Sequence, residues 1–147
     1  MGKDIFGNLY DWSDVLQQIE NLRQSFSLDE HQPGLVRILR YRNNWKLRET
    51  VLDCIKELKQ PDDSVIDAVL DIVMDDTVYY EQRILAADSL VQLCKKNEKA
   101  MKKFVEEVGK LVDAPHPSAF HKALNRITKQ IEDNETAYSG ASMEIAS

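Results

Sequence analysis

The side chains that most often act as nucleophiles or metal ligands are few in this chain and poorly spaced for such chemistry. Cys54 and Cys94 each lie in a run of apolar residues at helical spacing, where a thiol packs as a small, inert hydrophobic group. His116 and His121 do not match the i, i+4 pair of a helical metal site. We interpret the histidines as incidental surface or capping residues. We predict no catalytic, cofactor-binding or metal-binding residue.

Aspartates form a regular pattern that we call the acidic stripe: Asp63, Asp67, Asp71 and Asp75. Their spacing places them on one helix face, where like charges cost a few tenths of a kcal/mol per pair in an isolated helix. We favour a solvated outer face, while neutralisation by a basic partner or by a neighbouring segment of this chain stays open. A straight ladder does not converge its oxygens on a point, so a hard-metal site is disfavoured.

Lysines form the opposite pattern, which we call the lysine patch: Lys95, Lys96, Lys99, Lys102 and Lys103. We favour a solvated turn whose lysines help to satisfy the carbonyls at the end of the preceding helix. Contact with phosphate, RNA or anionic lipid is the alternative. The sequence does not decide whether the acidic stripe or the lysine patch is functional.

Composition narrows the class of protein further. The chain has 147 residues, 43% hydrophobic and 30% charged, which suits one folded domain, and its formal net charge of −6 disfavours nonspecific nucleic-acid binding. No apolar run approaches the ~20 residues that span a bilayer. The first residues, 1–4, carry no apolar signal segment, so we expect a cytoplasmic protein without membrane contact.

The elements that must position these side chains are helices, because apolar residues recur at i, i+3, i+4 and i+7 and never alternate for long. These apolar patterns predict about seven helices in an all-α domain over residues 1–132, followed by a flexible polar tail over 133–147. The predicted apolar stripes cover 15–26, 35–39, 47–58, 65–73, 84–94, 101–112 and 120–131.

Part of the helical pattern repeats along the chain. A shift of 35 residues superimposes Trp45 on Tyr80 and Arg48 on Arg83, with apolar positions following in register. A further shift of 37 places Phe120 at the arginine position. Such repetition, with degenerate copies at the ends, is typical of helix pairs that stack and bury one another's apolar faces.

The residues 43–52 and 76–87 resemble the second helix of a HEAT repeat. The first stretch has asparagines in the turn and then an apolar–Arg pair, Leu47-Arg48. The second keeps the Arg and an Ala-Ala pair, but has Gln82 where the family usually has an apolar residue. The resemblance covers roughly residues 28–132. It implies a short right-handed α-α superhelix, the armadillo-type solenoid, whose second helices line the concave side.

The arginines receive a structural role in this interpretation. The resemblance makes Trp45, Arg48, Tyr80 and Arg83 structural repeat positions. An arginine at the start of a second helix can reach the carboxylate of the preceding turn or the carbonyls of a neighbouring repeat.

The functional hypothesis is a non-enzymatic scaffold or adaptor that binds another protein with a basic surface. The second helices would present a mostly acidic face, with monomer and dimer both open. We expect the partner-binding residues to be Glu49, Asp53, Tyr79, Gln82, Leu85, Asp88 and Gln92. By the same resemblance, the alternative is a HEAT-like enzyme or enzyme accessory, similar to bilin lyases or to nucleic-acid-processing proteins.

Overall fold

The structure, a computed structural model, describes residues 3–112, 115–118 and 120–130, and helices are the regular secondary structure among them. No strand occurs among them, so the all-α prediction is confirmed. The predicted tail, 133–147, and the last apolar position, Ile131, lie outside the described residues.

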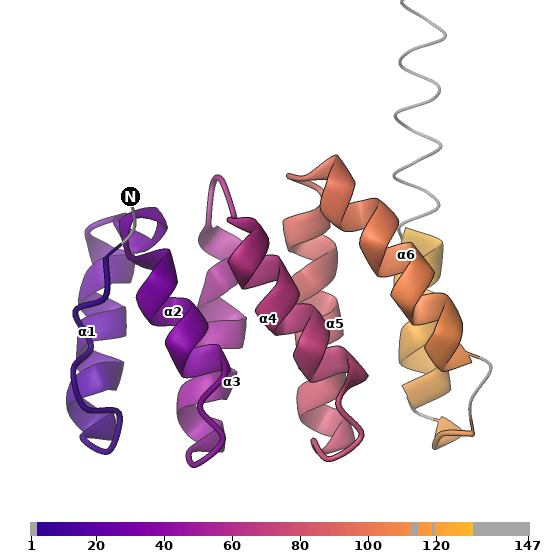
Figure 1. The fold of residues 1–147 in the computed structure, drawn as a ribbon, viewed down its shortest axis with the longest axis horizontal. Coiled ribbons are helices and arrows are strands. Elements are labelled where there is room, and N and C mark those ends of the chain that lie inside the picture. The colour runs from indigo at the N-terminus through magenta and orange to yellow at the C-terminus, as the bar shows by residue number, and fades with distance from the viewer. Residues whose placement is uncertain (1–2, 113–114, 119, 131–147) are drawn as a thin grey trace, which may run out of the picture.

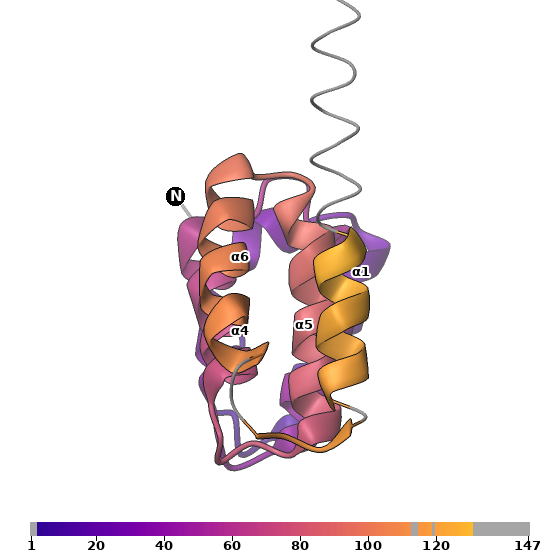
Figure 2. The same ribbon diagram turned by 90° about the vertical axis from the view of Figure 1, so that its right-hand side faces the viewer.

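Helices alternate between two layers, which both views show (Figures 1 and 2). One layer contains α2 (Gln32–Leu39), α4 (Asp63–Met74) and α6 (Glu98–Val112). The other contains α1 (Trp12–Gln24), α3 (Trp45–Cys54), α5 (Tyr80–Cys94) and a last helical segment, 120–130. Short 3-10 turns precede α2 and follow α3, at Leu28–His31 and Ile55–Glu57. We call α2, α4 and α6 the first helices, and the others the second helices.

Local signals in the sequence explain where helices begin and end. The Asn44 side chain accepts hydrogen bonds from the backbone N–H groups of Lys46 and Leu47, at 3.0 and 3.2 Å, and so caps α3. Pro33 lies in the first turn of α2, where a missing N–H costs no intrahelical bond. The helix α3 ends at Cys54, although the apolar pattern predicted helix as far as Leu58. The chain tightens after Cys54 into the 3-10 turn Ile55–Glu57.

The N-terminal residues 3–10, the N-terminal strap, pack along α2 without forming a helix (Figure 1). The ring of Phe6 is buried against Gly34, where an added Cβ would lie 2.7 Å from the ring carbons. Arg37 donates from Nε to the Asp4 carboxylate at 2.6 Å and from Nη1 to the Gly7 carbonyl at 2.8 Å. The strap is therefore held to α2 by both an apolar and a polar contact.

Polar contacts join consecutive second helices and the turns that follow them. The Ser89 hydroxyl on α5 donates to the Leu52 carbonyl on α3 at 2.6 Å. Lys96 donates to the Lys56 carbonyl at 2.8 Å, so this member of the lysine patch satisfies a carbonyl of the 3-10 turn after α3, whereas we expected the end of the helix that directly precedes the patch. A single apolar core extends from Phe6 to Ile127 around these contacts, which holds the helices at fixed positions.

Candidate functional site

The two repeat arginines occupy equivalent places in the fold. Nε of Arg48 donates to the Leu39 carbonyl at 3.0 Å, and Nε of Arg83 donates to the Val73 carbonyl at 2.9 Å. Both acceptors lie in the last turn of a first helix, where carbonyls have no intrahelical donor and the helix dipole favours a cation. The acceptor belongs to the helix paired with the arginine, whereas we expected a turn carboxylate or a neighbouring repeat.

The side chain of Arg83 is fully buried, and two aromatic rings of its own chain lie against its guanidinium. It is only 1% exposed, and its guanidinium carbon lies 4.6 Å from the ring centroid of Phe120 and 5.2 Å from that of Tyr80. A cation over a ring face is held by the negative face of the π system. The residue that replaces the arginine in the next repeat, Phe120, therefore covers the arginine of the preceding repeat.

His116 completes this enclosure, so our interpretation of it as an incidental surface or capping residue is wrong. Its Nδ1 lies 3.1 Å from the Tyr80 hydroxyl, and its ring contacts Tyr80, Phe120 and His121. Its backbone N–H donates to Nε2 of His121 at 3.2 Å. Burial, and secondarily the charge of Arg83, lower the pKa of His116 below its usual value. The sequence signal that we missed is the position of His116 one turn before Phe120.

The corresponding place beside Arg48 is open. Among the described residues, no aromatic ring covers its guanidinium, although the side chain is only 7% exposed. A groove of about 320 Å³ opens there between the α2–α3 turn and the start of α5. The groove is lined by Arg48, Trp45 and Tyr79, together with Arg42, Val78 and Gln82. Trp45 is 61% exposed and Tyr79 is 81% exposed, so two large rings stand in water at its edge.

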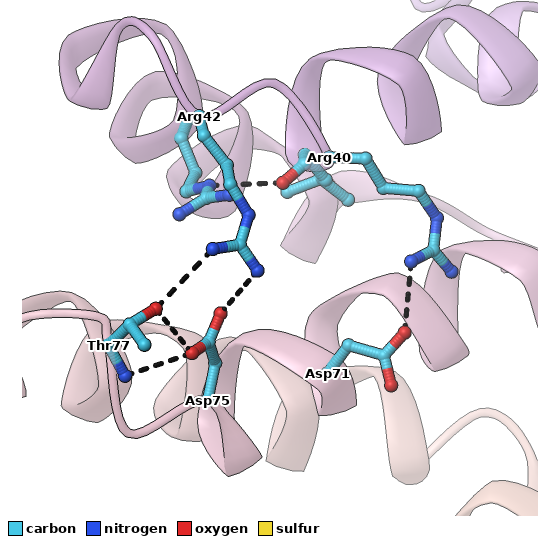
Figure 3. A network of polar contacts seen from close by, with 7 residues as sticks. Arg40, Arg42, Asp71, Asp75 and Thr77 are labelled. Atoms are coloured by element: carbon cyan, nitrogen blue, oxygen red, sulfur yellow. Dashed lines mark hydrogen bonds and ion pairs between the residues drawn. The ribbon is translucent and has the colours of Figure 1, made fainter.

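Polar contacts fix the rim of this groove. Arg42 donates from Nη2 to Asp75 at 2.8 Å and from Nη1 to the Thr77 hydroxyl at 3.4 Å (Figure 3). Thr77 donates to the same carboxylate from its hydroxyl at 2.6 Å and from its backbone N–H at 2.9 Å. These bonds, led by that of the Thr77 hydroxyl, lower the pKa of Asp75, so the carboxylate stays ionised at neutral pH. With Arg48 also charged, two cations face one carboxylate.

The acidic stripe is paired with neighbouring helices of this chain. Asp71 meets Arg40 at 2.9 Å (Figure 3), and Asp67 meets Lys103 of the lysine patch at 2.6 Å. Asp75 pairs with Arg42 as described. The solvated-face interpretation is therefore incomplete: the stripe points outward, but cations from both flanking segments neutralise it. Asp63 lines a small groove with Lys99 and Lys103.

The predicted partner-binding residues lie along α3 and α5. Asp53 is 3.6 Å from Lys56, and Asp88 is 3.0 Å from Arg126 of the last helical segment. The remaining residues of the predicted face, all partly exposed, are Glu49, Gln82, Leu85 and Gln92. Tyr79 and Gln82 also line the groove, so the predicted face and the groove are continuous. The residues that sequence reasoning missed are Arg42, Thr77 and Val78, which lie in turns without a periodic pattern.

The two cysteines are poorly suited to act as nucleophiles. Cys54 and Cys94 are buried, and burial raises the pKa of each thiol to about 12, so both are neutral thiols at physiological pH. Within residues 3–112, 115–118 and 120–130, no three His, Cys, Asp or Glu side chains gather where a metal ion would bind. No helix in the described part of the chain has the length and apolar character to cross a membrane.

Comparison with known proteins adds no relative: no family model, curated protein or solved structure matches this chain.

Proposed function

We propose that this chain is a non-enzymatic protein-binding module, built as a short right-handed solenoid of the HEAT-like type. The two alternating helix layers and the equivalent bonds of Arg48 and Arg83 support the solenoid (Figure 1). In such an array each helix pair buries the apolar face of the next, so the second helices form a rigid surface.

The observation that carries the binding function is the exposure of large rings at one edge of that surface. Trp12 and Trp45 begin α1 and α3, and Tyr79 directly precedes α5. Their exposed fractions are 49%, 61% and 81%. Tryptophan and tyrosine bury much area at low entropic cost, which makes them the usual anchors of protein interfaces. The edge therefore suits a protein partner.

The charge of the adjoining face favours a partner with a basic surface. Glu49 and Asp53 on α3 supply the acidic part, and Asp53 pairs with Lys56 of the following turn at 3.6 Å. Asp88 on α5 contributes less, because Arg126 pairs with it. A basic partner would dock on α3 and α5, with its edge against Trp45 and Tyr79.

Capture by matched charge-reversal variants tests this function. The double variant Asp53→Lys with Asp88→Lys should lose a partner that the natural chain retains from native lysate, while its thermal melt stays cooperative. Glu98→Lys with Glu106→Lys changes the charge equally on α6, outside the proposed face, and should retain the partner. Equal capture by both double variants would reject the face, and loss of capture in both would show that only total charge matters.

A further inference from the structure

The groove at Arg48 is an open copy of a slot that this chain fills elsewhere with its own rings. We propose that it binds an aromatic side chain from an extended segment of the partner protein, which stacks on the guanidinium of Arg48 between Trp45 and Tyr79. This inference rests on the proposed function, since it names what the partner inserts.

The slot at Arg83 supplies the template. There the guanidinium carbon lies 4.6 Å from the ring centroid of Phe120 and 5.2 Å from that of Tyr80, and the two rings contact each other with their centroids 4.9 Å apart. Tyr80 is three residues before Arg83, as Trp45 is three residues before Arg48. Both arginines donate Nε to the end of a first helix. The two slots therefore share their arginine, their anchoring bond and their preceding aromatic residue.

The Arg48 slot lacks the covering ring. Arg83 is 1% exposed and Tyr80 is half-buried, whereas Trp45 remains 61% exposed beside a groove of about 320 Å³. Nε is the only atom of the Arg48 guanidinium that has a hydrogen-bond partner among the described residues. Partial burial, and secondarily the charge of Arg42, lower the pKa of Arg48.

Electrostatics select the kind of occupant. Arg42 and Arg48 place two positive charges at the groove, and Asp75 offsets one of them. The face of an aromatic ring carries the negative part of its quadrupole, so it complements the remaining cation, whereas an aliphatic side chain does not. Trp45 and Tyr79 add apolar area to the lining of the groove. An aromatic ring on an extended segment therefore complements both the positive charge and the shape of the slot.

Titration of the full-length protein with small neutral probes tests the proposal. The probes are N-acetyl-phenylalaninamide and N-acetyl-leucinamide, and the signals are the indole N–H of Trp45 and the Nε–H of Arg48 in NMR spectra. We expect saturable shifts with the phenylalanine probe, with an affinity about threefold or more above that of the leucine probe. Equal affinity for both probes, or no shift, would overturn the proposal.

Variants locate the binding and separate the possible occupants. Tyr79→Ser should weaken the phenylalanine probe at least about threefold, whereas Trp12→Ser, which removes an exposed ring outside the groove, should leave it unchanged. Arg48→Lys keeps the charge but removes the planar face, and should also weaken the probe. If Arg48→Lys fails to fold, the Tyr79→Ser and Trp12→Ser pair still decides the question.

Three further outcomes would overturn the choice of a partner ring. If N-acetyl-leucine with a free carboxylate binds as tightly as the phenylalanine probe, the groove is an anion site. If Tyr138→Ala changes the Trp45 and Arg48 signals of the protein alone, the chain's own tyrosine is the occupant. If those signals change with protein concentration, the occupant is a second copy.

The probe experiment and the capture experiment fail independently. Loss of ring selectivity, with capture still dependent on Asp53 and Asp88, would remove this inference and leave the proposed function standing. Ring-selective binding without any face-dependent capture would leave a ring-binding groove and remove the proposed acidic face.

Discussion

Replacing each repeat arginine with methionine gives a quantitative test of the two slots. Arg83→Met removes a charge-assisted hydrogen bond to the Val73 carbonyl, worth about 1.5–3 kcal/mol, and ring contacts worth about 0.5–2 kcal/mol. Removing a buried charge whose Nη2 has no partner offsets part of this loss. We expect a net loss of about 2–3 kcal/mol in the free energy of unfolding, a fall of roughly 4–10 °C in Tm.

Arg48→Met should cost less, because it loses the bond to the Leu39 carbonyl but no ring contact. We expect about 1–2 kcal/mol. Urea unfolding followed by far-ultraviolet circular dichroism measures both values, with Arg126→Met, which removes an exposed ion pair, as a control worth less than ~1 kcal/mol. The reasoning is refuted if Arg83→Met is as stable as the natural chain, or if Arg48→Met is the more damaging substitution.

Three further substitutions test other parts of the structure. Phe6→Ala should lower the free energy of unfolding by about 3 kcal/mol in urea melts, because the ring is buried against Gly34; a loss below ~1 kcal/mol would mean that the N-terminal strap is not docked in solution. Ser89→Ala should cost about 0.5–1 kcal/mol, since the Leu52 carbonyl loses its buried hydroxyl donor, and no change in Tm would contradict that bond. The lowered pKa of His116 means that the unfolded chain binds its proton first, so this contribution to stability is complete above about pH 6.5 and is lost as the pH falls below it. Between about pH 7.5 and about pH 5, Tm should therefore fall less in His116→Phe than in the natural chain, and equal slopes would refute this.

Much of the helical pattern could be predicted because it depends on local chemistry. The Asn44 cap of α3 and the position of Pro33 in the first turn of α2 follow from groups a few residues apart. The N-terminal strap escaped prediction, since its apolar residues follow no helical period and Phe6 and Leu9 are buried only in the tertiary fold. The candidate groove escaped for a similar reason: Arg42 and Val78 lie in turns, where spacing carries no information about neighbours.

The sequence repeat showed which positions correspond in successive copies. It could not show which side chains surround each of those positions in the fold. The alignment placed Phe120 at the arginine position of the next copy, and only the structure revealed that this ring covers Arg83. It likewise could not indicate that cations on both sides pair with the acidic stripe, because Arg40 and Lys103 lie on segments distant in sequence.

The sequence by itself determined that this chain forms amphipathic helices in a repeating order, because periodicity, caps and proline act within one or two turns. Only the tertiary structure decided which arginine is enclosed and which faces an open groove. That difference depends on whether a side chain from the next helix pair reaches the guanidinium, and such a contact is set by packing between segments more than thirty residues apart.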